Sequence, residues 1–366
     1  MHLSQKFFGA EESPQIDIIQ PHLKTLYVRN TSHSPDKAIT HYNVSFAPNC
    51  TVYDQAHENV LHANSAISDI YIEFKSKAEE DAFLIDIPDQ PSSVSSPLMN
   101  PAPQGVLTAG QITTYAALQL DSQYRTHVFS ILIVGDYARL IRWDRSGAIV
   151  TAPIYYQRDP ELMDFFTRFD QAEKPARGHD SSVRKATPAE AKKAMYANTS
   201  FNSPELLVVT VPSKDCESKC SDYVIKPPIA RPYTPPGRAT RTSIAYDIQR
   251  DVIVFFKDSW RIACDEVVRE GEVYTILNAA NVPNIPYCSA SGDVGDDLYH
   301  LTSTSRFANA SWVKCTPELT PHRHHRLILD HIGKRLETFR CSKDMVSAIR
   351  AALTGAYPTL FTSLAV

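Results

Sequence analysis

The sequence predicts an α+β protein in which two mixed domains follow one another along the chain. Apolar residues make up 43% of its 366 residues, enough to build cores of ordinary size. Runs of β-branched and aromatic residues alternate with helical patterns in both halves. A charged and polar stretch, residues 172–200, lies between the halves and predicts a linker.

The first half begins with a predicted short helix and loop, up to about residue 40. Strands are predicted over 43–48 and 68–76, where β-branched and aromatic residues recur with a period near two. A helix is expected over 108–125, because Thr108 and Gln111 have the spacing of a capping box. Two strands are then predicted within 126–144, another within 147–156, and a helix over 159–172 whose aromatic stripe faces the core.

The second half restarts the pattern after a short helix that begins at Thr187, with Glu190 completing a capping box. Strands are predicted over 205–211, 243–248, 251–260 and 326–333, and helices over 266–280 and 341–355. The expected organisation is an N-terminal region (1–40), a mixed domain (41–171), the linker (172–200), a second mixed domain (201–354) and a tail (355–366).

The net charge and the cysteine content limit the cellular location and the kinds of binding partner that we expect. The net charge of −4 argues against a basic nucleic-acid surface over the whole chain. Neither a basic leader nor a long apolar run follows Met1, so we expect no signal peptide and no membrane span. The seven scattered cysteines are expected to be reduced thiols of an intracellular protein, in the cytoplasm or the nucleus.

Lys257 carries the first indication of chemistry. It ends the apolar strand VIVFF, and a helix with Glu270 and Glu272 follows about a dozen residues later. Protein kinases hold the α- and β-phosphates of ATP with a strand lysine that a helix glutamate orients. By itself this pattern also fits a solvated strand end followed by an ordinary helix.

Longer segments decide between these interpretations. In order along the chain stand RTHVFSILIVGDYARLIRWDRSGAIVTAPI, PPGRATRTSIAYDI, VIVFFKDSWR, REGEVYTILNAANVPNIP and HRLILDHIGKRLETF. Together they resemble the fungal-type protein kinase family (FunK1) over roughly residues 40–354. The resemblance implies a family-specific domain followed by a kinase-like small lobe that uses ATP and Mg²⁺. By position, Lys257 matches the ATP-binding lysine, Glu272 is the first choice for its partner with Glu270 second, and Gly237 stands in the glycine-rich loop.

The chain also departs from the family pattern. The loop has one glycine, and neither H-R-D-x-x-x-x-N nor D-F-G occurs. The basic segment 322–326 precedes the expected hinge at 327–333, so it cannot be the catalytic loop, and we expect it in a solvated loop. We therefore expect a kinase-like chain truncated before the catalytic loop, a pseudokinase unable to transfer phosphate as written. The incomplete lobe is expected to need another protein to cover it.

A second pattern lies in the first half. Glu73 and Lys75 alternate on one strand and so share a face, and Asp54 precedes them. This arrangement resembles PD-(D/E)xK nucleases, in which Asp54 and Glu73 would hold Mg²⁺ and Lys75 would steady the phosphate. Gln111 extends the resemblance through a Q-x-x-x-Y pattern.

Each of these residues also has an ordinary explanation. The charges suit a solvated strand face, Gln111 suits a helix cap, Asp54 suits a turn, and Asp69 competes for the role of Asp54. Two alternative functions therefore stand beside the kinase-like one. They are a Mg²⁺-dependent nuclease-like or nucleic-acid-binding N-terminal domain, and a non-enzymatic module that binds a protein partner.

Overall fold

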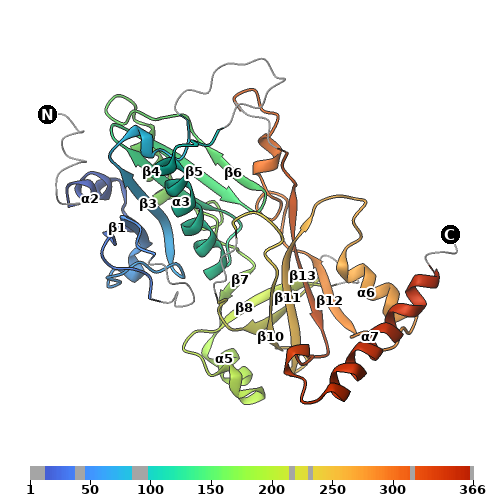
Figure 1. The fold of residues 1–366 in the computed structure, drawn as a ribbon. Helices are drawn as coiled ribbons and strands as arrows, with labels where there is room; N and C mark the ends of the chain where they lie inside the picture. Colours follow the sequence, from blue (N-terminus) through green and yellow to red (C-terminus); the bar gives the residue numbers. More distant parts are fainter. Residues whose placement is uncertain are drawn as a thin grey trace. The chain divides into compact units, whose positions relative to one another are not determined.

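The structure is a computed structural model that describes residues 13–37, 46–84, 98–213, 219–229, 234–313 and 318–362 (Figure 1). It is an α+β fold with two separate sheets, as predicted. The chain divides into two compact units. Unit 1 comprises residues 1–181, 228–239 and 296–322, and unit 2 comprises residues 182–227, 240–295 and 323–366. Among the described helices, none combines the length and the apolar content needed to cross a membrane.

Unit 1 contains a six-stranded sheet in the order β1-β2-β3-β4-β5-β6. The first three strands form an antiparallel meander, β3 and β4 are parallel, and β4 to β6 are antiparallel again. The long helix α3 makes the crossover between β3 and β4, as parallel neighbours require. The elements are α2 (Ser13–Ile19), β1 (Leu26–Asn30), β2 (Cys50–Asp54), β3 (Ser68–Lys75), α3 (Pro103–Ser122), β4 (Val128–Val134), β5 (Tyr137–Asp144), β6 (Gly147–Val150) and α4 (Glu161–Gln171).

Both faces of this sheet are buried, which explains the continuous apolar run of β4. Ile131 and Ile133 point to one face, where they pack with α2 and α4. Leu132 and Val134 point to the other face, where α3 covers them. Phe166 and Phe169 of α4 are buried in the first of these cores and Phe165 packs against it, so the prediction of an aromatic core stripe is confirmed.

Two local predictions for unit 1 were wrong. Helix α3 begins at Pro103, with Ala102 as its N-cap, so Thr108 and Gln111 lie inside the helix and form no capping box. A proline in the first turn fits a helix start, because its missing N–H would have no partner there. The strand expected at 43–48 lies at 50–54 instead. Residues 46–48 are not in a strand, and residues 43–45 lie outside the described part of the chain.

Unit 2 contains a seven-stranded sheet in the order β12-β13-β11-β10-β9-β8-β7. Helix α5 packs through Ala194 against apolar side chains of β8, β9 and β10. The predicted capping box of α5 is confirmed, since Thr187 and Glu190 each accept a backbone N–H of the other. The elements are β7 (Val183–Lys185), α5 (Pro188–Ala197), β8 (Leu207–Pro212), β9 (Cys220–Ile225), β10 (Arg241–Asp247), β11 (Val252–Ile262), α6 (Glu270–Ala279), β12 (Cys288–Asp293), β13 (His322–Leu329) and α7 (Ser342–Thr362).

A buried ion pair joins the middle of this sheet. Arg326 of β13 is fully buried, and its Nε donates to Asp258 of β11 at 2.8 Å. The same guanidinium donates through Nη1 to Ser182 Oγ at 2.7 Å and to the Thr210 carbonyl at 2.9 Å. His324 lies 3.0 Å from the same carboxylate. Three strands and the start of a fourth are thereby tied to one guanidinium.

This arrangement contradicts the prediction of a solvated loop over 322–326. The segment forms most of β13, and His322, His324, His325 and Arg326 are buried. His324 and Arg326 lie against Asp258 of β11, and His325 lies against Asp293 of β12, so each of these three buried groups has an acidic partner. His322 Nδ1 lies 2.8 Å from the Thr320 carbonyl.

We predict that Asp258→Asn lowers the free energy of unfolding of unit 2 by about 3–5 kcal/mol at neutral pH, because it leaves Arg326 buried without its counter-charge. Burial alone would raise the pKa of Asp258, but His324 and Arg326 hold it well below its usual value of 3.8. The stabilisation is therefore present above that usual value and is lost as the pH falls through the lower folded pKa. Hydrogen exchange of the β13 amides measures the effect.

The matched control is Asp222→Asn, which removes half of a surface pair with Arg184 in the same sheet. Exposed pairs contribute at most about 1 kcal/mol, so this variant should exchange nearly as the wild type does. Equal protection of β13 in both variants would refute a central role for the buried pair.

Candidate functional sites

Lys257 lies on the third strand of unit 2 counted from β9, and α6 follows that strand. Its Nζ donates to both carboxylate oxygens of Glu270, each at 2.7 Å. Both side chains are partly exposed, 21% for the lysine and 29% for the glutamate. Kinases place their ATP-binding lysine on the third strand of the small lobe and pair it with a helix glutamate. Counted in this way, which leaves out β7 and β8, the strand order β9-β10-β11-β13-β12 places Lys257 on the third strand, and the lysine pairs with Glu270 rather than with Glu272.

A close backbone approach brings the start of α6 to the sheet. Gly271 packs against β12 so tightly that a Cβ atom there would lie 2.0 Å from Ser291 Oγ. Only glycine fits this contact, and it positions the preceding residue, Glu270, in front of Lys257. Glu272 instead lies 3.1 Å from Arg269 and is half exposed.

The structure therefore replaces the first choice of partner, Glu272, by the second choice, Glu270. Two residues along a helix turn the side-chain direction by about 200°, so the two glutamates cannot share a face. The position of the helix start, at Glu270, decides which of them faces Lys257.

Gly237 lies in the connection between β9 and β10, where the resemblance placed a glycine-rich loop. The described residues of this loop from 234 to 239 belong to unit 1. The Gly237 N–H donates to the Arg145 carbonyl at 2.9 Å, and Arg145 Nη1 donates to the Pro235 carbonyl at 3.0 Å. Gly237 has a φ of +117°, which glycine tolerates. Its N–H is therefore engaged within unit 1.

In unit 1, the side chains of Glu73 and Lys75 point from β3 toward α3. Glu73 Oε1 accepts from Lys75 Nζ at 2.8 Å and from Gln111 Nε2 at 2.7 Å. Gln111 Oε1 accepts from Lys75 at 3.0 Å, and its Nε2 also donates to the Tyr115 hydroxyl at 2.9 Å. The structure thus joins Glu73, Lys75 and Gln111, three of the four residues that the sequence proposed, in one network.

Glu73 has an unusual environment for a carboxylate. Its side chain is 5% exposed, and its Oε2 has no hydrogen-bond partner among the described residues. Burial raises the pKa of Glu73, against the opposing effects of Lys75, the Asn49 backbone N–H and Gln111. A buried oxygen without a donor destabilises the folded state, and such groups are common where a ligand or ion binds.

The fourth proposed residue, Asp54, is not part of this network. It ends β2, and its Oδ1 accepts the backbone N–H of Ala56 at 3.0 Å, which caps the following turn. Cys50 at the other end of β2 lies opposite Ile72, so the antiparallel register carries Asp54 away from Glu73. The proposed metal pair Asp54 and Glu73 is therefore not formed.

Asp69, the competitor for the role of Asp54, is also used elsewhere. It lies 2.7 Å from Arg125 and 2.9 Å from His179, and all its neighbours in this cluster belong to unit 1. Burial by itself would raise the pKa of Asp69, but Arg125 and His179 hold it below its usual range. We interpret this buried cluster as structural, because each carboxylate oxygen faces a cation.

The residue that does stand beside Glu73 is Asn49, which the sequence did not reveal. Its Oδ1 accepts the Phe74 N–H at 2.9 Å. Only the strand register brings it there, so a search for acidic residues could not have found it.

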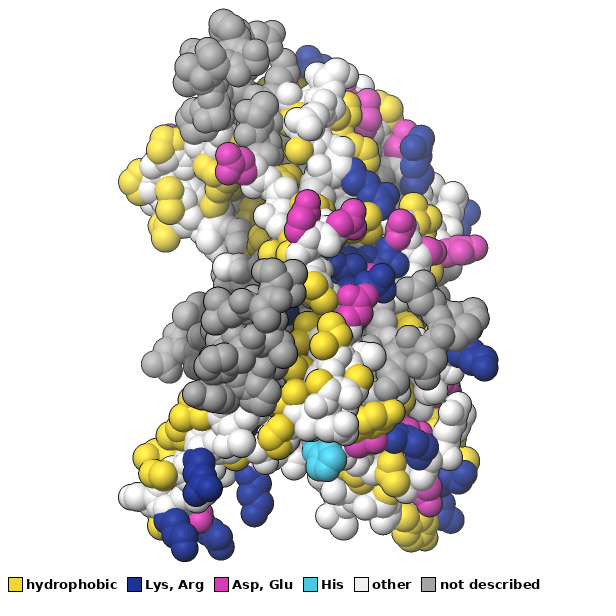
Figure 2. All heavy atoms as spheres, turned by 90° about the vertical axis from the view of Figure 1, so that its right-hand side faces the viewer, with side chains coloured by type: hydrophobic (Ala, Val, Ile, Leu, Met, Phe, Trp, Pro, Cys, Tyr) yellow, Lys and Arg dark blue, Asp and Glu magenta, His cyan; other side chains and the backbone are white. Residues whose placement is uncertain are grey.

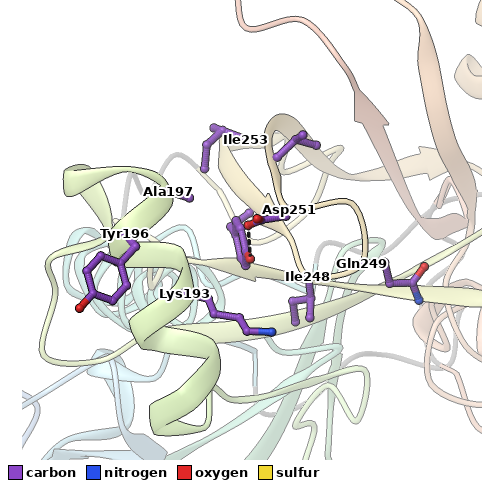
Figure 3. Close-up of a pocket in the computed structure, with 9 residues that line it drawn as sticks. Lys193, Tyr196, Ala197, Ile248, Gln249, Asp251 and Ile253 are labelled. Atoms are coloured by element: carbon purple, nitrogen blue, oxygen red, sulfur yellow. Dashed lines mark hydrogen bonds between the residues drawn. The ribbon is translucent and has the colours of Figure 1, made fainter.

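A cavity in unit 2 is separate from the networks described above. A cavity of about 700 Å³ in unit 2 lies between α5 and the turn from β10 to β11, lined by Lys193, Ile248, Gln249 and Asp251 among others (Figure 3). That turn is at the end of the β10–β11 hairpin opposite to Lys257, which pairs with Thr242. The cavity is therefore separate from the Lys257–Glu270 pair.

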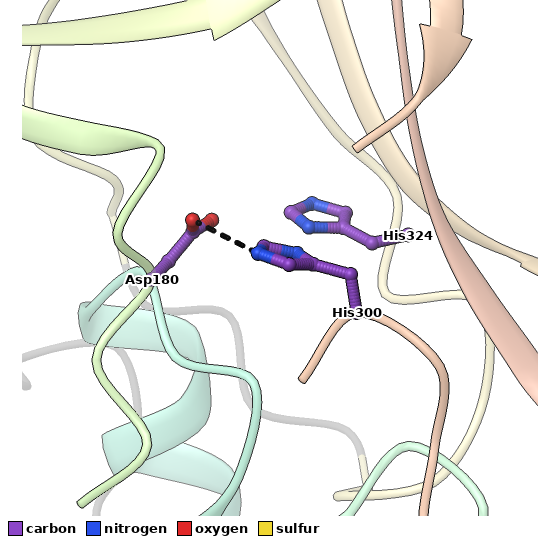
Figure 4. Close-up of side chains that lie close together, drawn as sticks. All are labelled: Asp180, His300 and His324. Atoms are coloured by element: carbon purple, nitrogen blue, oxygen red, sulfur yellow. Dashed lines mark ion pairs between the residues drawn. The ribbon is translucent and has the colours of Figure 1, made fainter. Parts of the chain in front are cut away.

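In unit 1, Asp180 Oδ1 lies 3.7 Å from His300 Nε2, and both side chains are buried (Figure 4). This pair links the segment after α4 to the segment 296–322. His324, also drawn in Figure 4, belongs to unit 2, where Asp258 is its partner.

Comparison with known families gives one match. The family described as "Fungal protein kinase" matches residues 104–364, well over half of the 366 residues. Searches of curated proteins and of solved structures gave no match. Within unit 1 the match begins at the start of α3. It also includes all the described residues of unit 2, and with them the lysine–glutamate pair. The chain therefore belongs to the fungal protein kinase family.

Proposed function

We propose that unit 2 binds the phosphates of ATP through Lys257 and that this polypeptide does not transfer phosphate on its own. The observation that carries the proposal is the ion pair between Lys257 of β11 and Glu270 of α6, with an N–O distance of 2.7 Å. In kinases this pair holds the α- and β-phosphates, and its formation accompanies the active arrangement of the small lobe.

Two features of the sequence limit what such a site could do. The loop between β9 and β10 contains five prolines, Pro227, Pro228, Pro232, Pro235 and Pro236, none of which has a backbone N–H to offer a phosphate. No H-R-D-x-x-x-x-N or D-F-G sequence occurs in the 366 residues. These motifs supply the residue that positions the substrate hydroxyl and the two Mg²⁺ ligands. ATP binding would therefore depend strongly on Lys257, and transfer would lack both positioning and metal.

We predict that Lys257→Ala weakens binding of a fluorescent ATP analogue at least about tenfold, because a charge-assisted hydrogen bond contributes about 1.5–3 kcal/mol. Lys185→Ala is the matched control, since Lys185 is an exposed lysine of the same sheet paired at 3.4 Å with Glu205. Equal affinities of the two variants would refute the proposed ATP site. Transfer of labelled phosphate to a generic acceptor should not exceed that of Lys257→Ala, and activity above this level would refute the proposed inactivity.

A second candidate function concerns unit 1, and the orphan Oε2 of Glu73 favours it. We propose that Glu73, Lys75 and Gln111 bind a nucleic-acid phosphodiester together with a divalent cation. The order β2, β3, α3, β4, with β3 parallel to β4, supports the nuclease-like resemblance noted in the sequence. Among the described residues the network contains one carboxylate, so binding is favoured over cleavage, which generally uses more than one acidic ligand.

We predict that Lys75→Ala weakens binding of a DNA duplex in Mg²⁺ about three- to tenfold and reduces the slope of log K against log[salt] by about 1. Lys77→Ala is the control, because Lys77 is two residues further along, 69% exposed, and paired only at 3.6 Å with Glu79. Equal effects of both substitutions would contradict a site at Lys75. Any cleavage of the duplex should disappear in Glu73→Ala.

A third proposal is that α7 binds another protein. Val346, Ile349 and Leu353 are spaced for one face of α7 and are 57%, 44% and 65% exposed. Figure 2 views the side of the molecule that carries α6 and α7, and hydrophobic side chains there are interspersed with basic ones. Exposed apolar stripes of this kind commonly mark binding surfaces.

We predict that the purified protein self-associates or binds a partner, and that Ile349→Glu reduces this association, because a charge on the stripe opposes burial. Light scattering with size-exclusion chromatography measures it. A wild-type protein that remains monomeric at high concentration, with no partner, would count against this proposal. No disulfide joins the described cysteines, which are Cys50, Cys220, Cys264, Cys288 and Cys341, and this supports a proposed location inside the cell, in the cytoplasm or the nucleus.

A further inference from the structure

Asn49 lies at the point where a second acidic ligand would complete the Glu73 site. Cys50 is opposite Ile72 in the antiparallel pairing of β2 and β3, so one step along the ladder brings Asn49 level with Glu73. The hydrogen bond from the Phe74 N–H to Asn49 Oδ1, at 2.9 Å, fixes the amide in this position. Asn49 is similar in size to an aspartate but carries no charge.

We propose that Asn49 makes the binding of a divalent cation at Glu73 depend on a bound phosphodiester, so that neither ligand binds well without the other. This inference rests on the second proposed function, the nucleic-acid site of unit 1. In this proposal, Asn49 is the residue that makes the cation need a bound phosphodiester as a second anionic ligand.

The charges of the network support this dependence. Glu73 supplies one negative charge, Lys75 balances it at 2.8 Å, and Gln111 and Asn49 are neutral. A divalent cation at the free Oε2 of Glu73 would therefore meet a network with no net negative charge. Mg²⁺ is commonly held by one or two carboxylates together with phosphate oxygens of the substrate. With one carboxylate present, the phosphate must supply the second anionic ligand.

The same reasoning applies from the side of the phosphodiester. Lys75 is the cation of the network, and its Nζ is already engaged by Glu73 and Gln111. A divalent cation on Glu73 would compensate the carboxylate and release Lys75 toward the phosphate. Because binding free energies are reciprocal, the nucleic acid must strengthen cation binding by the same factor by which the cation strengthens nucleic-acid binding.

Aspartate at position 49 would remove the dependence. A second carboxylate level with Glu73 gives the cation two charged ligands from the protein, so the phosphate is no longer required. Asn64→Asp is a matched control, because Asn64 also lies in unit 1 and its Oδ1 accepts a local backbone N–H, from Ala66 at 3.0 Å. Both substitutions add the same charge, but only the one at position 49 adds it beside Glu73.

The experiment measures the affinity of the full chain for Mn²⁺ by electron paramagnetic resonance, alone, with a 16-base-pair DNA duplex, and with inorganic phosphate. For the wild type we expect the duplex to tighten Mn²⁺ binding at least about tenfold, within the usual range of coupling between sites. We expect inorganic phosphate to have a much smaller effect, and Glu73→Gln to abolish the tightening. Asn49→Asp should bind Mn²⁺ without DNA, and Asn64→Asp should behave like the wild type.

Three results would overturn the inference. They are equal Mn²⁺ affinity of the wild type with and without a duplex that is shown to bind the protein, equal tightening by phosphate and duplex, and no gain of Mn²⁺ binding in Asn49→Asp when circular dichroism shows it folded. Failure of the underlying nucleic-acid site has a different signature, in which the duplex binds neither protein although Asn49→Asp gains Mn²⁺. The wild-type comparison requires no substitution, so it decides the question even if Asn49→Asp does not fold.

Discussion

Unit 2 depends on the charge of one buried guanidinium. Arg326 draws β13, β11, β8 and the residue before β7 onto a single planar group, and Asp258 supplies the counter-charge. An unpaired charge in this position would be strongly unfavourable, so strand pairing and charge pairing must form together. Asp258 directly follows Lys257, and alternate residues of a strand face opposite ways. Fixing Asp258 on one face therefore fixes Lys257 on the other face, toward Glu270.

Unit 1 contrasts two kinds of buried carboxylate on the same face of one strand. Asp69 has both oxygens opposite cations, from Arg125, Arg177 and His179. Glu73, four residues further along, has one oxygen in hydrogen bonds and one that has no hydrogen-bond partner in the part of the chain that the structure describes. The first arrangement stabilises the fold. In the second, one carboxylate oxygen can still take up a proton, accept a hydrogen bond or coordinate a cation. This difference, rather than the presence of acidic residues, separates the structural cluster from the candidate site.

Elements whose pattern is local could be predicted from the sequence. Strand β3, the apolar strands β4 and β5, the aromatic face of α4 and the capping box of α5 depend on neighbouring residues, and the structure contains all of them. Lys257 on its strand was equally visible, because an apolar run ending in lysine is a local feature. Strands β1, β7, β9 and β12 were missed, since they are short or only weakly apolar.

The remaining errors concern contacts between distant residues. The choice between Glu270 and Glu272 required the position of the helix start, which a glycine contact with β12 sets. Burial of His324, His325 and Arg326 required acidic partners some 30 to 70 residues away. The exclusion of Asp54 and the placement of Asn49 required the register between β2 and β3. Sequence patterns indicate which residue types are available, but register decides which of them meet.

The interleaved order of the two units has a consequence for how the protein is made. Unit 1 is complete only after residues 228–239 and 296–322 have been synthesised, by which time much of unit 2 has also left the ribosome. Domains usually fold one after another during synthesis, starting from the N-terminus. Here a nascent chain that stops near residue 181 would leave the buried guanidinium of Arg145 without the Pro235 carbonyl that it bonds in the finished protein. The two units are therefore expected to mature nearly together, as one late event in translation.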